Sequence, residues 1–184
     1  MRRFNSLFLG IDSLILIATT ASAVAQPRGS ILAAIQTNRG TYLTAVNGGG
    51  LGGPNAGPDA VPVHTDSTSV RQWETFAIVW LDTNHTQFAL RTWNGHYVTA
   101  AQGGGVGGPN NGWAPVHADA TTVRRDERWR LDFLGGDRVA ISLPNGRFLS
   151  AVNGGGMNGP PNTPVQTNRL QIGAWETFRL IRLR

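Results

Sequence analysis

The sequence predicts an all-β protein built from three similar units, because one stretch of eleven residues occurs three times. Each copy starts with a glycine, continues through an aromatic residue and an alanine, and ends in three consecutive glycines. The copies span 40–50, 95–105 and 146–156, so their first glycines lie 55 and 51 positions apart. A period of about 50 residues is typical of folds whose units must pack together to bury a common core.

Alternating apolar residues precede each leading glycine, and this period of two predicts a half-buried strand. The inward positions would be Ala33 and Ile35, Phe88 and Leu90, and Val139 and Ile141. Asn94-Gly95 and Asn145-Gly146 then predict hairpins with type I′ turns, in which both central residues have positive φ. The first copy has Asn38-Arg39-Gly40 instead, one residue longer, so we expect its loop to differ.

The strand after each turn carries an alanine at the same offset, Ala45, Ala100 and Ala151. Three identical small residues indicate a crowded position, as a threefold axis would create. A third strand follows each glycine-rich loop and starts with proline, which is tolerated at the first residue of a strand. These third strands are expected at 62–66, 115–119 and 164–168.

A fourth strand in each copy begins with a glutamate and carries an aromatic residue at a matching position. The expected ranges are 74–80, 127–133 and 176–180, with Phe76, Trp129 and Phe178 aligned. Twelve short strands separated by turn signals, without a convincing helix, favour a closed β-architecture. The threefold repetition makes this a β-trefoil, with repeats at about 31–81, 87–134 and 138–183.

Residues 1–25 have the pattern of a cleaved export signal. Two arginines near the N terminus are followed by an apolar centre at 14–18 and a small-residue cleavage site at 23–25. The apolar run is shorter than the roughly 20 residues that a membrane span needs. We therefore expect a signal peptide at 1–25 and one β-trefoil domain at 26–184, secreted or periplasmic, without a membrane span and monomeric.

The composition and motifs argue against catalysis, metals and cofactors. The chain has no cysteine, which excludes disulfides, thiol catalysis and zinc–thiolate sites. Each glycine-rich loop matches Gly-x-Gly-x-x-Gly, but a proline and a strand follow it, where a dinucleotide site needs a helix N terminus. The basic stretch 124–130 is interrupted by carboxylates, which is typical of a solvated, self-paired face and not of a nucleic-acid site. No nucleophile–base motif occurs, so we expect neither an enzyme nor a cofactor.

Two histidine–aspartate pairs, His64 with Asp66 and His117 with Asp119, could hold a metal or act in acid–base chemistry. In the third copy the corresponding residues are Gln166 and Asn168, which keep the hydrogen-bonding shape and lose the basicity and the charge. This favours a structural contact that braces the long loop, with no metal. The three glutamates of the chain, one in each copy, are likewise expected to be structural.

Two tryptophans, Trp93 and Trp113, have no counterparts in the other copies. Trp93 adjoins the turn of the second copy, and Trp113 lies in the loop of that copy, with Tyr97 and Asn111 near in sequence. Aromatic rings beside amides suit carbohydrate, because sugar faces stack on the rings and the amides bind hydroxyl groups. The alternative is that the rings cover the end of the barrel. We predict a ligand site at Trp93, Tyr97, Asn111 and Trp113.

The chain also resembles a known family over residues 31–183. The first copy carries the strand Gly40 to Ala45 and the sequence Trp-Glu-Thr-Phe at 73–76. The third copy carries the strand Gly146 to Ala151 and the same four residues at 175–178. Both combinations are similar to the fascin-like β-trefoil domain. The second copy departs from this pattern at 126–129. The resemblance implies a β-trefoil and a protein-binding or actin-binding role. The leading prediction is a non-enzymatic secreted module that binds carbohydrate or a cell-surface polysaccharide; the alternative is a fascin-like module that binds a protein or an actin filament.

Overall fold

The computed structural model describes residues 29–52, 61–108, 114–158 and 163–184. Within these ranges the chain forms twelve β-strands, with short 3-10 turns and no α-helix. No helix in the described part is long and apolar enough to cross a membrane. The expected signal segment 1–25 and two predicted site residues, Asn111 and Trp113, lie outside the described residues.

The twelve strands divide into three repeats of four. Repeat one consists of β1 (Ile31–Gln36), β2 (Tyr42–Ala45), β3 (Val63–Ser67) and β4 (Phe76–Trp80). Repeat two consists of β5 (Gln87–Arg91), β6 (Tyr97–Ala100), β7 (Val116–Ala120) and β8 (Trp129–Gly135). Repeat three consists of β9 (Arg138–Ser142), β10 (Phe148–Ala151), β11 (Val165–Arg169) and β12 (Phe178–Arg182).

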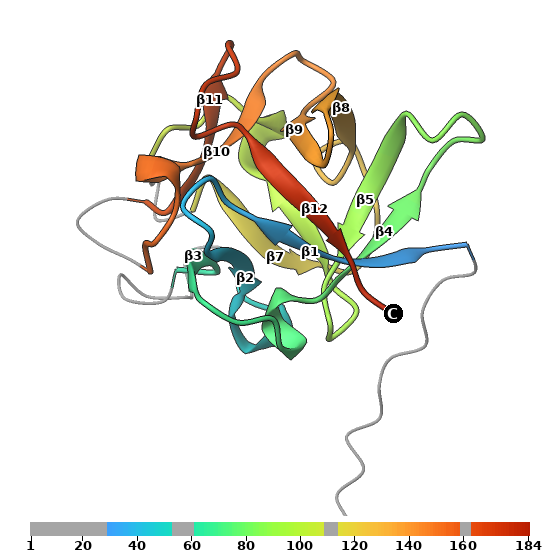
Figure 1. Cartoon of the computed structure of the whole chain (residues 1–184). Helices are drawn as coiled ribbons and strands as arrows, with labels where there is room; N and C mark the ends of the chain where they lie inside the picture. The colour runs from blue at the N-terminus through green and yellow to red at the C-terminus, as the bar shows by residue number, and fades with distance from the viewer. Residues whose placement is uncertain (1–28, 53–60, 109–113, 159–162) are drawn as a thin grey trace, which may run out of the picture.

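The first and fourth strands of the three repeats close a six-stranded antiparallel barrel. β1 pairs with β4, β4 with β5, β5 with β8, β8 with β9, β9 with β12, and β12 again with β1. The last and first strands of the fold therefore lie side by side, as Figure 1 shows, with Ile35 opposite Leu180. Closure removes the exposed edges that an open sheet would present.

The second and third strands of each repeat form an additional hairpin, β2–β3, β6–β7 and β10–β11. The third strands β3, β7 and β11 contact one another, so the hairpins meet around a common pseudo-threefold axis. A six-stranded barrel with three such hairpins is a β-trefoil. The fold class that the repeats predict is confirmed.

The core consists of the inward residues predicted from the alternating pattern. Ala33 and Ile35 of β1 are buried, as are the four residues at the same positions in β5 and β9. The three repeated alanines are buried and belong to the same apolar cluster. The largest fully buried side chain is that of Trp129, whose Nε1 donates to the carbonyl oxygen of Val98 at 3.1 Å.

The hairpin turns differ from the prediction of type I′. Neither Asn94 nor Asn145 is among the described non-glycine residues with positive φ, whereas the glycine after each of them has φ near +80°. In repeat two, the amide of Gly95 donates to the carbonyl oxygen of Thr92, and the amide of Thr92 donates to that of His96. This is a three-residue loop that ends in a left-handed glycine, the next most common hairpin connection.

The same two hydrogen bonds occur in the first and third repeats, between Thr37 and its partners and between Leu143 and its partners. The expectation that the first loop differs is therefore wrong. A three-residue loop needs only its last residue to be left-handed, so Asn38-Arg39-Gly40 fits it as well as Asn94-Gly95 does. The threefold counterparts of Trp93 are consequently Asn38 and Pro144.

Candidate ligand-binding site

The glycine-rich loops join each repeat to the next one. The amide of Gly50 donates to the carbonyl oxygen of Ala118 in β7 at 2.6 Å, and the amide of Ala118 donates to that of Leu51 at 2.9 Å. The loop of repeat two pairs in the same way with Thr167 of β11, and the loop of repeat three pairs with β3. These loops hold the three repeats in a ring, which is a structural role.

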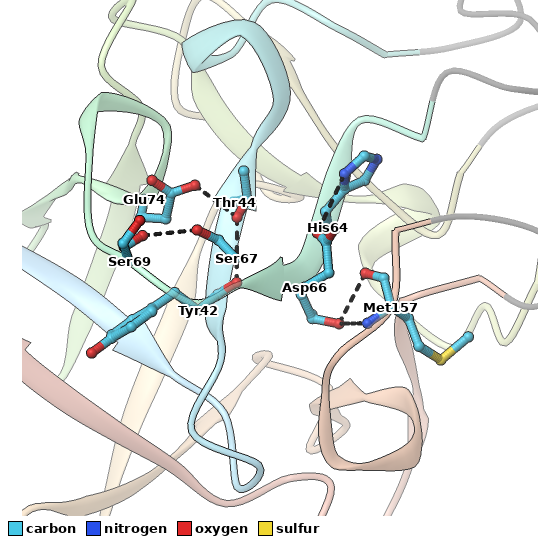
Figure 2. Close-up of polar contacts among 9 residues, drawn as sticks. Tyr42, Thr44, His64, Asp66, Ser67, Ser69, Glu74 and Met157 are labelled. Carbon is cyan, nitrogen blue, oxygen red and sulfur yellow. Dashed lines mark hydrogen bonds and ion pairs between the residues drawn. The ribbon is translucent and has the colours of Figure 1, made fainter.

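The histidine–aspartate pairs lie beside these loops. His117 Nδ1 is 2.5 Å from Asp119 Oδ1, and the corresponding distance from His64 to Asp66 is 3.7 Å (Figure 2). A Cβ atom at Gly52 would come within 2.2 Å of the Asp119 carboxylate, so that carboxylate lies directly against the loop of repeat one. The structure therefore agrees with a bracing role. Among the described residues, no group of three or more potential metal ligands occurs.

His64 should make the stability of the protein depend on pH. Burial lowers its pKa from the usual 6.5, and the nearby Asp66 opposes this shift. A lowered pKa in the folded state favours the neutral ring, so its contribution to stability is fully present above pH 6.5 and is lost as the pH falls through the folded-state pKa. We expect His64→Gln, which introduces the residue of repeat three, to flatten the decline of the free energy of unfolding between pH 6.5 and 5. His85→Gln at an exposed position is the matched control, and an unchanged slope in His64→Gln would contradict the prediction.

The three glutamates anchor the loop between the third and fourth strands of each repeat. In repeat one, Glu74 Oε1 accepts from the Thr44 hydroxyl at 3.0 Å (Figure 2), and its Oε2 accepts from the main-chain amide of Arg71 at 2.9 Å. The same pair of bonds is made by Glu127 with Thr99 and Arg124, and by Glu176 with Ser150 and Gly173. All three glutamates are buried. The structural role predicted for them is confirmed.

Each anchored loop presents the residue that precedes the glutamate. In repeat one this residue is Trp73, whose side chain is 44% exposed. In repeat three it is Trp175, which is partly exposed. In repeat two it is Asp126, whose carboxylate accepts from Arg125 Nε at 2.9 Å. Two of the three equivalent loops thus present an indole ring, and the third presents an ion pair.

A pocket lies at each of these tryptophans. That of repeat one has a volume of about 610 Å³, and its lining includes Ser67, Ser69, Gln72 and Trp73. That of repeat three has a volume of about 580 Å³. Its lining includes Asn168, Arg169, Leu170, Gln171, Ile172 and Trp175. Both pockets combine an indole with amide or hydroxyl groups, the combination that sugar binding requires.

The structure describes two residues of the site predicted in repeat two. Trp93 and Tyr97 are both partly buried, and they lie on the turn and on the first residue of β6. The turn itself packs against repeat one, because Asn94 Nδ2 donates to the carbonyl oxygen of Asn47 at 2.6 Å. Asn111 and Trp113 fall outside the described part of the chain, so the site in repeat two stays a prediction.

Sequence reasoning did not select Trp73 and Trp175, because it searched for tryptophans without counterparts. The signal was nevertheless present. Both residues directly precede a repeated glutamate, and only the second copy has an aspartate at that position. A residue that recurs in two copies of three need not belong to the core.

Comparisons with solved structures support the fold. A scan with protein-family models gives no match, and neither does a search of curated proteins. The chain is similar to ThreeFoil, a designed protein with threefold symmetry, at 17% identity and a TM-score of 0.64, over 83% of this chain and 99% of that one. It is similar to the Rhizoctonia solani agglutinin at 14% identity and a TM-score of 0.62, over 87% and 99% of the two chains.

A third similar structure is SeviL bound to asialo-GM1 saccharide, at 9% identity and a TM-score of 0.57, over 84% of this chain and 99% of that one. Likenesses at these identities establish the fold and nothing further, since one fold serves many functions. The β-trefoil implied by the resemblance to the fascin-like family is confirmed, whereas membership of that family is not established.

Proposed function

We propose that this chain is a non-enzymatic carbohydrate-binding module and that Trp73 and Trp175 are its principal stacking residues. The observation that carries the proposal is the pair of equivalent loops, each of which holds a solvent-accessible indole at a pocket of about 600 Å³. The apolar face of a pyranose ring stacks on indole, and neighbouring amides and hydroxyl groups bind its hydroxyl groups.

The exposed position of Trp73 favours a role in ligand binding over a role in the core. A tryptophan that is 44% exposed leaves a large apolar area in water. Its loop is already fixed by the buried carboxylate of Glu74, so the ring is not needed to close the loop. Ser67 and Gln72 on the pocket lining offer polar groups to a sugar.

The fold is compatible with this function by analogy. The Rhizoctonia solani agglutinin and the saccharide-bound SeviL share the β-trefoil architecture with this chain. The export signal proposed for residues 1–25 would bring the module to a compartment where cell-surface glycans are accessible. We further propose that the mature module is monomeric and secreted or periplasmic.

The surface around Trp93, Tyr97, Asn111 and Trp113 is a second candidate site for the same function. Its unpaired tryptophans have no counterpart in the other repeats. Variants of these residues should therefore be tested together with variants of the two pockets.

We expect Trp73→Ala and Trp175→Ala each to weaken one binding site of the mature protein. A glycan array identifies the best oligosaccharide, and titration calorimetry then gives its affinity and stoichiometry. Each single variant should weaken binding at its own site about fivefold or more, because a stacking contact contributes about 1 kcal/mol, and the double variant should be weakened at both sites. The melting temperature of Trp73→Ala should stay near that of the wild type, since this ring is largely outside the core.

Trp93→Ala and Trp113→Ala serve as the comparison set. If they abolish binding while the double variant of Trp73 and Trp175 binds normally, the site lies in repeat two. If no glycan binds and the protein instead co-sediments with actin filaments, carbohydrate recognition is wrong and the fascin-like role takes its place.

A further inference from the structure

The two tryptophan pockets differ in charge, although the fold makes them equivalent. In repeat three, the guanidinium carbon of Arg169 lies 5.7 Å from the centre of the Trp175 ring, within the range of a cation–π contact. The residue at the position of Arg169 in repeat one is Ser67, whose hydroxyl donates to the carbonyl oxygen of Ser69. Among the described residues, a cation therefore lies over the ring of repeat three and none over the ring of repeat one.

A second guanidinium lies close to the same pocket. Arg147 Nη1 donates to the carbonyl oxygen of Asn168, the residue directly before Arg169, at 3.0 Å. Within the described ranges neither Arg147 nor Arg169 forms an ion pair with a carboxylate. Both guanidinium groups therefore keep N–H donors for an external anion.

Within the described residues, the carboxylate that lines this pocket forms no ion pair with either arginine. Both oxygens of Glu176 already accept hydrogen bonds, from Ser150 and from the amide of Gly173. Asn168 stands where repeat one has Asp66, so an amide replaces a carboxylate beside the pocket. Each pocket is lined by one arginine and one glutamate, Arg71 with Glu74 in repeat one and Arg169 with Glu176 in repeat three, so these groups do not distinguish the two pockets. The additional guanidinium of Arg147, which is bonded to the pocket-lining Asn168, therefore makes the pocket of repeat three the more positive of the two.

The pocket of repeat three also presents two exposed aliphatic side chains. Leu170 is 65% exposed and Ile172 is 41% exposed, and both line it together with Trp175. A ligand for this pocket needs an apolar face toward these side chains and an anionic group toward Arg169. A pyranose ring that carries a carboxylate or a sulfate group has both features, and guanidinium binds either anion through paired hydrogen bonds.

We infer that the Trp175 pocket selects an acidic saccharide, with Arg169 as the residue that determines this specificity. The inference rests on the proposed carbohydrate function and adds the class of ligand. Arg169 supplies a charge-assisted hydrogen bond to the anionic group. Its contact with the indole already restricts the arginine side chain, so less side-chain entropy is lost when the ligand binds. Uronates and sulfated sugars share this chemistry.

The test is titration calorimetry of the mature protein with three probes of the same size. These are a glucuronate-containing tetrasaccharide, its counterpart reduced to neutral glucose, and a sulfated tetrasaccharide. We expect at least one acidic probe to bind tenfold or more tightly than the neutral one. Arg169→Ser, which introduces the residue of repeat one, should remove that preference, so that the acidic and neutral probes bind this variant with affinities within twofold of each other.

Arg128→Ser is the matched control, because it removes the same charge from an exposed position in the loop of repeat two that corresponds to the loop carrying Trp175. If it weakens acidic binding as much as Arg169→Ser does, the preference comes from net charge and the inference is wrong. It is also wrong if acidic and neutral probes bind equally, or if inorganic sulfate alone competes fully. Each of these results leaves the proposed function intact, since that depends on Trp73 and Trp175.

Discussion

Gly155→Ala should lower the free energy of unfolding by about 3 kcal/mol or more, because this glycine lies where two repeats meet. Gly155 has φ +107° and ψ −175°, a conformation open almost only to glycine, and one such residue costs about 1–3 kcal/mol in strain. A Cβ atom there would come within 2.2 Å of Thr37 Oγ1 and within 2.7 Å of Thr41 Oγ1. These hydroxyl groups bond each other at 2.8 Å, so the added methyl group would also separate a hydrogen-bonded pair.

The loop cannot move away without further loss. Its neighbour Gly156 donates to the carbonyl oxygen of Thr65 at 2.7 Å, and this bond joins repeat three to repeat one. Displacing the loop would break it, and an unpaired buried main-chain group costs about 1–3 kcal/mol. The Gly155→Ala substitution therefore destabilises the contact between repeat three and repeat one that closes the ring of repeats.

Gly136→Ala is the control for the effect of positive φ alone. Gly136 has φ +63°, and no atom lies within 4 Å of the position of its Cβ. Its substitution should cost only about 1–2 kcal/mol, the price of a left-handed alanine. Urea denaturation of both variants measures the difference, and equal losses would show that steric contact between the repeats contributes nothing.

The fold was predictable because the sequence repeats the pattern of each strand three times. Ile35, Leu90 and Ile141 occupy the same offset and the same buried position, so one correct alignment assigns three strands at once. The turn type was not predictable from Asn94-Gly95 alone, since these two residues suit both a two-residue loop and a longer one. The longer loop is set by contacts of each turn with the glycine-rich loop of another repeat, such as that from Asn94 to Asn47.

The candidate site was less predictable because exposure is a tertiary property. Trp73 and Trp129 look alike in the sequence, as aromatic residues on either side of a repeated glutamate. One is 44% exposed and the other is fully buried. The difference arises from the bonds of the glutamate to the preceding loop, which leave the residue before it outside the barrel. The contact of Arg169 with Trp175 likewise joins residues of a strand and a loop, and no spacing rule predicts it.

Glu176→Ala should destabilise the protein by about 3–5 kcal/mol, although it removes no apolar contact from the barrel. The carboxylate accepts from the Ser150 hydroxyl at 2.6 Å and from the amide of Gly173 at 2.9 Å, and Glu176 is only 5% exposed. Hydrogen bonds to a charged group contribute about 1.5–3 kcal/mol each, and alanine leaves both donors unsatisfied. The variant should also lose saccharide affinity in the pocket of repeat three, because the loop that presents Trp175 loses its anchor.

Glu176→Gln separates the hydrogen bonds from the charge. The glutamine oxygen can accept from the amide of Gly173, and the Ser150 hydroxyl can turn to accept from the glutamine NH₂ group. Both contacts survive without the charge, so the loss should be only about 1–2 kcal/mol, and Trp175 should keep its place at the pocket. Urea denaturation followed by tryptophan fluorescence measures both variants. If Glu176→Ala stays within 1 kcal/mol of the wild type, the buried carboxylate does not hold the loop, and the position of Trp175 depends instead on the hydrogen bond from the Ala151 amide of β10 to its carbonyl oxygen.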